Sequence, residues 1–194
     1  MLDYIQQNWL EVLGTMVGLI YLWLEMRASI YLWIAGIVMP AIYIFVYYDA
    51  GLYADFGIQI YYLVAAVYGL LVWKFFRTKH DKALPIKHMP LRLYPGCIVA
   101  FAVAYGIILY ILLNYTNSTV PYLDTFTTAL SIVGLWLLAR KYIEQWVAWI
   151  AVDAVCVGLY IYKGIYFTAA LYALYTLLAV YGYFKWQRMM KAGC

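Results

Sequence analysis

Long apolar segments dominate this sequence and constrain its fold more than any other feature. A helix needs about 20 mainly apolar residues to cross a bilayer. The segments lack the in-and-out alternation that the strands of a membrane barrel show. The sequence therefore predicts an all-α membrane protein with seven transmembrane helices. Their expected positions are Trp9–Leu24, Ser29–Tyr48, Asp55–Trp73, Tyr94–Leu113, Asp124–Ala139, Ile143–Tyr162 and Ile165–Phe184.

The composition excludes most soluble functions. Hydrophobic residues make up 68% of the chain and charged residues only 11%, whereas soluble domains carry about 25% charged residues. Seven spans within 194 residues leave no room for a separate catalytic domain. We therefore expect a lipid bilayer as the surroundings and no nucleic-acid partner. Cys97 and Cys156 lie in apolar runs, which argues against a disulfide framework.

The positive charges predict the orientation, because cytoplasmic loops are enriched in Lys and Arg. Nearly all of them fall on one side of a seven-span arrangement, and Lys163 alone falls on the other. We expect a multi-pass protein of a bacterial inner membrane, with its N-terminus outside and its C-terminus in the cytoplasm. The residues on the basic side are Arg27, Lys74, Arg77, Lys79, Lys82, Lys87, Arg92, Arg140, Lys141, Lys185, Arg188 and Lys191.

The chain contains an internal repeat, which appears when the sequence is shifted by 113 positions. Three spans, a basic loop and one further span separate equivalent positions, so both three-helix repeats enter the membrane from the same side. Parallel repeats of this kind occur in secondary transporters, where substrate binds between the repeats. We expect a first repeat at residues 1–75, a basic loop at 76–92, a linker helix at 93–115, a second repeat at 116–186 and a tail at 187–194. The shift pairs Trp23 with Trp136, Arg27 with Arg140, Trp33 with Trp146, Tyr62 with Tyr175, and Trp73 with Trp186.

A stripe on the sixth span is the first candidate for substrate binding. Trp146, Trp149 and Asp153 have the spacing W-x-x-W-x-x-x-D, which places them on one face of a helix. A carboxylate at membrane depth costs about 2.5–3.5 kcal/mol on insertion scales, so it calls for a partner or a function. Indole faces suit flat rings and organic cations. One alternative is structural, with a neutral Asp153 bonded to a neighbouring helix and the indoles serving only in packing. A proton-relay role for Asp153 is another.

The first repeat supplies the other candidate residues. Trp33 is the repeat partner of Trp146, and Pro40 takes the position of Asp153. A proline within a helix frees a backbone carbonyl, which can contact substrate or simply mark a kink. Gln59 and Tyr62 lie on nearly one face of the third span and are expected to form a polar wall.

The sequence offers no catalytic arrangement. His80 and His88 have no suitably spaced metal-ligating partners, and no phosphate-binding loop is present. We expect no metal, no cofactor and no enzymatic activity. A small membrane enzyme would need a second polar catalytic group at membrane depth. An accessory subunit of an energised transporter is a further alternative.

Three runs resemble the PnuC-type vitamin transporters: LYADFGIQ, WVAWIAVD and GLYIYKGIYFTAALYALY, which begin at Leu52, Trp146 and Gly158. The resemblance implies a homotrimer of seven-span protomers. It also implies facilitated diffusion of an unphosphorylated vitamin that a cytoplasmic kinase then traps. The substrate contacts that it implies fall on Trp146, Trp149, Asp153 and Gln59.

Two departures from that family pattern bear on the substrate. Members that resemble W-x-x-W-x-x-x-N carry an amide where this chain has Asp153, and Pro40 replaces an Asn that is usual in their first repeat. Loss of both amides disfavours a riboside, whereas a carboxylate suits the thiazolium and aminopyrimidine of thiamine. We therefore expect thiamine as substrate, as in the branch called PnuT. Nicotinamide riboside is the alternative, and a sugar facilitator built on similar triplets is a less favoured one.

Overall fold

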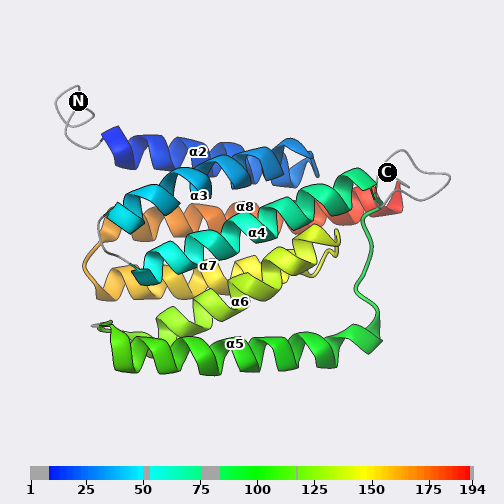
Figure 1. Ribbon diagram of the computed structural model, residues 1–194. Coiled ribbons are helices and arrows are strands. Elements are labelled where there is room, and N and C mark those ends of the chain that lie inside the picture. The colour runs from blue at the N-terminus through cyan, green and yellow to red at the C-terminus, as the bar shows by residue number, and fades with distance from the viewer. Residues whose placement is uncertain (1–8, 50–52, 76–83, 117, 193–194) are drawn as a thin grey trace. The chain divides into compact units, whose positions relative to one another are not determined.

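The computed structural model describes residues 9–49, 53–75, 84–116 and 118–192. Over this part of the chain it contains seven α-helices and a short 3-10 helix, η1, at Leu91–Leu93, and the chain divides into two units at Phe75 (Figure 1). The predicted all-helical architecture is thus confirmed, although His80 and much of the expected basic loop lie outside the described residues. The helices are α2 (Trp9–Met26), α3 (Tyr31–Asp49), α4 (Tyr53–Phe75), α5 (Tyr94–Tyr115), α6 (Pro121–Ala139), α7 (Gln145–Tyr162) and α8 (Tyr166–Lys191).

The helix bounds follow the apolar segments to within a few residues, with one larger difference. Helix α8 continues past Phe184 to Lys191, although its last part is polar. Arg188 and Lys191 lie in its final turn, where positive charge interacts favourably with the helix dipole. Helices α4 to α8 are each long and apolar enough to cross a bilayer, whereas the apolar described stretches of α2 and α3, Thr15–Met26 and Tyr31–Phe45, are shorter.

In the first unit, α3 packs against both α2 and α4. Helix α2 ends at a tight turn in which Ala28 has a φ of 49°. The Ser29 N–H donates to the Leu24 carbonyl at 3.0 Å, and the Ala28 N–H donates to the Glu25 carbonyl at 2.8 Å. This is the Schellman pattern, which satisfies the last carbonyls of a helix and reverses the chain.

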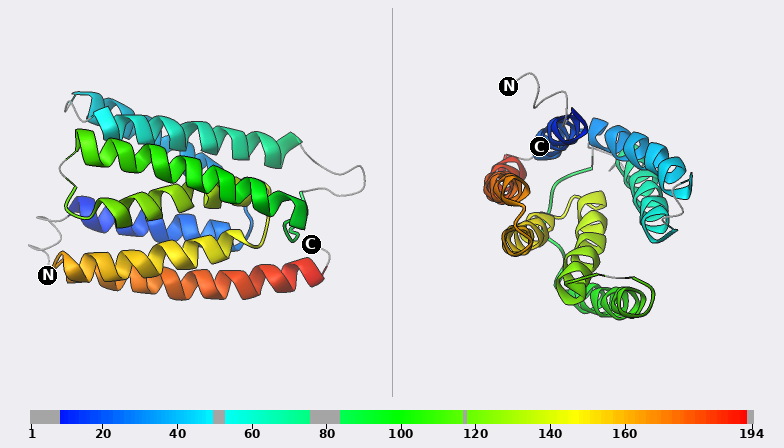
Figure 2. Two further views of the ribbon diagram at one scale, coloured as in Figure 1. Left: turned by 90° about the horizontal axis from the view of Figure 1, so that it is seen from below. Right: turned by 90° about the vertical axis from the view of Figure 1, so that its left-hand side faces the viewer.

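In the second unit, each helix from α5 to α8 packs against the next one along the chain. Helix α5 lies at the edge of this unit beside α6 (Figure 2). None of its residues is buried, and Ile98, Val103 and Ile107 are among its exposed side chains. An apolar helix with so much exposed surface suits a lipid environment, which is consistent with its expected role as the linker span.

The two repeats share their backbone turns as well as their sequence. Lys141 has a φ of 53° and its N–H donates to the Leu138 carbonyl at 2.9 Å, as Ala28 does to Glu25. The guanidinium of Arg140 lies 5.8 Å from the ring centroid of Trp136, and Arg27 lies 4.0 Å from that of Trp23. Each of these pairs is offset by 113 residues, so the local structure agrees with the predicted internal repeat.

The segment that precedes α5 is fixed to the turn between α6 and α7. The Lys87 N–H donates to the Lys141 carbonyl, and the Ile143 N–H donates to the Lys87 carbonyl, both at 3.1 Å. Glu144 holds the same segment, because its Oε2 accepts the Met89 N–H and its Oε1 lies by His88 Nδ1, both at 2.9 Å. We call these contacts the loop clasp.

Candidate substrate-binding site

Trp146 anchors α7 to α8 rather than presenting an open indole face. Its side chain is 0% exposed. It meets Trp186 edge to face, with ring centroids 5.6 Å apart and ring planes at 89°. A Cβ added at Gly182 would collide with the Trp146 ring, so the close approach depends on glycine. The contacts of Trp146 therefore fit the structural alternative, in which the indole serves in packing.

Trp33 makes the equivalent contact in the first repeat. It is 1% exposed and meets Trp73 edge to face at 5.5 Å and 88°. Gly69 provides the space for its ring, because a Cβ at this position would overlap the indole. Trp33 and Trp146 therefore fix the second helix of each repeat against the third.

Trp149 is the partly exposed indole of the predicted stripe. Its ring lies over Gly134 of α6, where an added Cβ would be 3.6 Å from the ring atoms Cε2 and Cζ2. Its buried Nε1 has no hydrogen-bond partner among the described residues. In the first repeat the sizes are exchanged, since Gly36 takes the place of Trp149 and Tyr21 on α2 takes the place of Gly134.

Asp153 is half-buried on α7, one helical turn beyond Trp149 and two turns beyond Trp146. It lies close enough to Cys156, Tyr172 and Tyr175 to act on them electrostatically. Tyr172 of α8 in turn stacks on Tyr160, with ring centroids 5.2 Å apart. These neighbours carry no positive charge, so a cationic ligand would be a favourable partner for the carboxylate.

The remaining predicted residues lie in the first unit. Pro40 is buried within α3, and its missing N–H leaves the Gly36 carbonyl without the usual helix hydrogen bond. Gln59 and Tyr62 are partly exposed on α4, and the Tyr62 ring lies 5.8 Å from that of Tyr61. Trp146, Trp149 and Asp153 share one helix of the second unit.

Three buried polar residues of the structure were not predicted from the sequence. Gln145 is 0% exposed, and neither its amide nitrogen nor its amide oxygen has a hydrogen-bond partner among the described residues. Thr125 is also fully buried, with an unpartnered hydroxyl over the same part of the chain. Glu25 is 2% exposed and lies inside α2, beyond the end predicted for the first span. A signal for Gln145 was present, because the repeat pairs it with the apolar Leu32.

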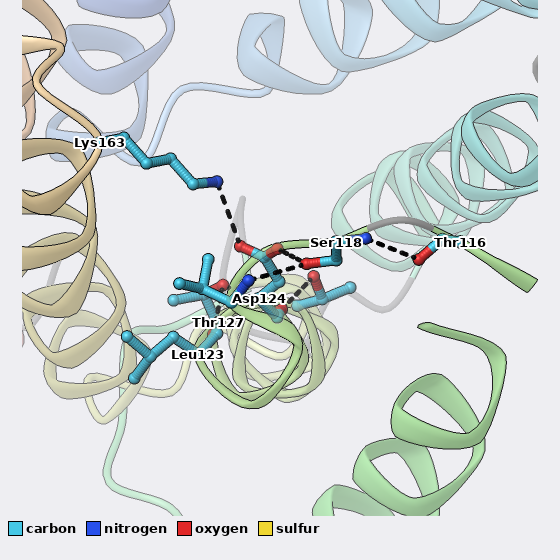
Figure 3. Close-up of polar contacts among 8 residues, drawn as sticks. Thr116, Ser118, Leu123, Asp124, Thr127 and Lys163 are labelled. Atoms are coloured by element: carbon cyan, nitrogen blue, oxygen red, sulfur yellow. Dashed lines mark hydrogen bonds and ion pairs between the residues drawn. The ribbon is translucent and has the colours of Figure 1, made fainter. Parts of the chain in front are cut away.

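A polar cluster lies at the start of α6, between the α5–α6 and α7–α8 connections (Figure 3). The Ser118 hydroxyl donates to Asp124 Oδ2 at 2.6 Å, and Lys163 Nζ lies 3.9 Å from Asp124 Oδ1. The Thr127 and Thr128 hydroxyls donate to the backbone carbonyl of Asp124 at 3.1 and 2.8 Å. The cluster ties the α5–α6 connection to the α7–α8 connection.

A membrane helix bundle built from two three-helix repeats and a linker helix is an architecture of secondary transporters. The family model described as nicotinamide mononucleotide transporter matches residues 8–188, and the chain belongs to this family, that of the PnuC transporters.

Named relatives span almost the whole chain. The nicotinamide riboside transporter PnuC of Escherichia coli K12 is 22% identical over 92% of this chain and 85% of its own length. That of Neisseria mucosa is 25% identical over 95% of this chain and 74% of its own. The riboflavin/roseoflavin transporter RibM of Streptomyces davaonensis is 27% identical over 92% of this chain and 84% of its own length.

The fold has a counterpart among solved structures. The crystal structure of the vitamin B3 transporter PnuC matches with a TM-score of 0.74 and 21% sequence identity. The match covers 99% of this chain and 86% of that one. It supports the seven-helix arrangement of two triplets and a linker.

Proposed function

We propose that this protein takes up an unphosphorylated vitamin across the bacterial inner membrane, and that nicotinamide riboside is its first candidate substrate. The observation that carries the proposal is the partly exposed Trp149, seated on Gly134, with Asp153 one turn further along the same helix. An indole face and a carboxylate together suit a flat cationic ring. The names of three relatives given above support a vitamin as the cargo.

In this proposal the vitamin ring stacks on Trp149, and its positive charge faces Asp153. Trp146 completes the stripe mainly by holding α7 against α8, and Trp33 does the same for α3. In the first repeat, Gln59, Tyr62 and Pro40 remain the candidate substrate contacts that the sequence predicts.

Transport then follows by rocking of one triplet against the other. No ion or ATP coupling is proposed, so the vitamin moves down its own gradient. Phosphorylation by a cytoplasmic kinase would retain it inside the cell. We further propose a homotrimer, with the N-terminus of each protomer outside and the C-terminus in the cytoplasm. The concentration of Lys and Arg on one side supports this orientation.

Thiamine is the second candidate, and Asp153 is the observation that favours it. Thiamine carries both a cationic ring and an amine that a carboxylate can bind. The sequence reasoning placed thiamine first, but the relatives reported above are named for nicotinamide riboside and riboflavin. Nicotinamide riboside is also cationic, so Asp153 is compatible with either substrate.

Calorimetric titration of the purified protein against nicotinamide riboside, thiamine, riboflavin and glucose tests the proposal. We expect nicotinamide riboside to bind most tightly and glucose not to bind. Trp149→Ala should abolish binding, whereas Tyr122→Ala, which removes an exposed ring at the other end of the unit, should leave it unchanged. Binding of none of the three vitamins would contradict the proposed function.

A further inference from the structure

Gln145 is a polar side chain that the second unit buries completely. It is 0% exposed, and both its Oε1 and its Nε2 lack a hydrogen-bond partner among the described residues. Its backbone is well placed, because its N–H donates to the Tyr142 carbonyl at 3.2 Å as α7 begins. A buried amide left unpaired costs about 1–3 kcal/mol at each group, so this side chain lowers the free energy of unfolding of the protein without ligand.

The first repeat shows that the fold does not need this amide. Leu32 takes the equivalent position, is also 0% exposed, and its N–H donates to the Ser29 carbonyl at the same 3.2 Å. The two flanking tryptophans, Trp33 and Trp146, make matching contacts with their own third helices. An apolar side chain therefore fits the same backbone and neighbouring indole, and the amide of Gln145 calls for a different explanation.

The unpartnered polar atoms of Gln145 and Trp149 can each be assigned as a donor or an acceptor. Trp149 follows Gln145 by four residues, so the two side chains lie one turn apart on the same side of α7. Gln145 Nε2 and Trp149 Nε1 are donors, and Gln145 Oε1 is an acceptor. The Gln145 amide thus offers a donor and an acceptor side by side, next to the indole on which the vitamin ring is proposed to stack.

We propose that Gln145 recognises a donor–acceptor edge on the substrate ring and sets its specificity. A ring carboxamide fits this pattern, because its oxygen accepts from Gln145 Nε2 and its NH₂ donates to Gln145 Oε1. The aminopyrimidine of thiamine presents a similar edge, with a ring nitrogen as acceptor and an amino group as donor. This inference rests on the proposed function, since it assigns a role within the same site.

The test compares wild-type protein with Gln145→Leu, which copies the residue of the first repeat. Nicotinamide riboside and pyridine riboside, the analogue without the carboxamide, are titrated separately by calorimetry, and thiamine is a third probe. We expect the wild type to prefer nicotinamide riboside by at least about tenfold, the effect of one well-placed hydrogen bond. Gln145→Leu should reduce that preference to about threefold or less. Gln187→Leu, an amide change on α8, is the matched control and should keep the preference.

A second measurement separates recognition from folding. Without ligand, Gln145→Leu should unfold at a temperature no lower than the wild type, because it removes an unpaired buried amide. Gln145→Glu keeps the size and the acceptor but loses the Nε2 donor, and should also lose the preference. Riboside binding by the wild type with an unchanged preference in both variants would overturn this inference alone. Failure of the wild type to bind any of the probes would overturn the proposed function as well.

Discussion

Trp146 meets Trp186 edge to face on the space left by Gly182, and Trp33 meets Trp73 in the same way on Gly69. This contact is common to both repeats and fixes the second helix of each triplet to the third. The neighbouring contact differs between the repeats. In the second repeat Trp149 packs on Gly134, whereas in the first repeat Tyr21 packs on Gly36. The repeats thus share their packing and differ where α7 carries the proposed substrate residues.

Gly182→Ala is expected to destabilise the protein, because the added methyl group would overlap the Trp146 ring. Overpacking of this kind typically costs about 1–3 kcal/mol. Thermal unfolding in detergent measures the effect, and Gly69→Ala should behave alike. Gly106→Ala on α5 is the control, since a Cβ there meets nothing within 4 Å. Equal unfolding temperatures for the G182A and G106A variants would contradict the packing described here.

Asp153→Asn is expected to weaken binding of a cationic vitamin by about tenfold or more, because hydrogen bonds to charged groups contribute about 1.5–3 kcal/mol. The substitution keeps the size of the side chain and removes its charge. Binding is measured by titration with nicotinamide riboside at neutral pH. Asp124→Asn, which alters the polar cluster at the end of the unit, serves as a comparison. Undiminished affinity in the D153N variant would remove this carboxylate from the site.

Lys141 is expected to make stability depend on pH. Burial lowers the pKa of its ammonium group from 10.5 to about 8. Between these values the unfolded chain binds more protons than the folded protein does, so the free energy of unfolding should rise as the pH increases from about 8 to 10.5. Chemical unfolding across this range should show the rise, and Lys141→Met should flatten it. Lys191→Met removes an exposed lysine and should keep the wild-type slope. An identical slope in the K141M variant would contradict this assignment.

Glu144→Ala is expected to release the loop clasp. Both carboxylate oxygens of Glu144 contact the segment before α5, one at the Met89 N–H and one at His88 Nδ1. Without them, the backbone amide of Met89 should exchange its hydrogen faster, as mass spectrometry of deuterium uptake can measure. Glu144→Gln keeps an oxygen that can accept the Met89 N–H, so its exchange should be intermediate. Unchanged protection in the E144A variant would show that the backbone pairing of Lys87 holds the segment alone.

The architecture was predictable because bilayer thickness and the repeat both leave direct marks on the sequence. Apolar length located the helices, and the paired tryptophans and arginines located the duplication. The end of α8 was missed because its last turns are polar and extend beyond any apolar run. Trp146 and Trp149 looked alike in sequence, yet one is fully buried against Trp186 and the other is partly exposed. Spacing on a helix cannot separate these roles, because they depend on the glycines of neighbouring helices.

Gln145 shows a second limit of prediction from the sequence. An amide just before two tryptophans reads as an ordinary polar residue at the start of a helix, and only tertiary packing buries it. The comparison with Leu32 was available in the aligned repeats, but it gains meaning once both positions are seen to be fully buried. Glu25 was placed outside the first span because the apolar run ends before it, whereas α2 continues to Met26.

Uptake of labelled nicotinamide riboside into sealed proteoliposomes tests the central claim most directly. Proteoliposomes with wild-type protein should fill until the free internal concentration equals the external one, with or without a proton gradient. Those with Trp149→Ala should match protein-free liposomes. Failure of the wild type to exceed protein-free liposomes would contradict transport of this vitamin, and accumulation above the external concentration would contradict facilitated diffusion.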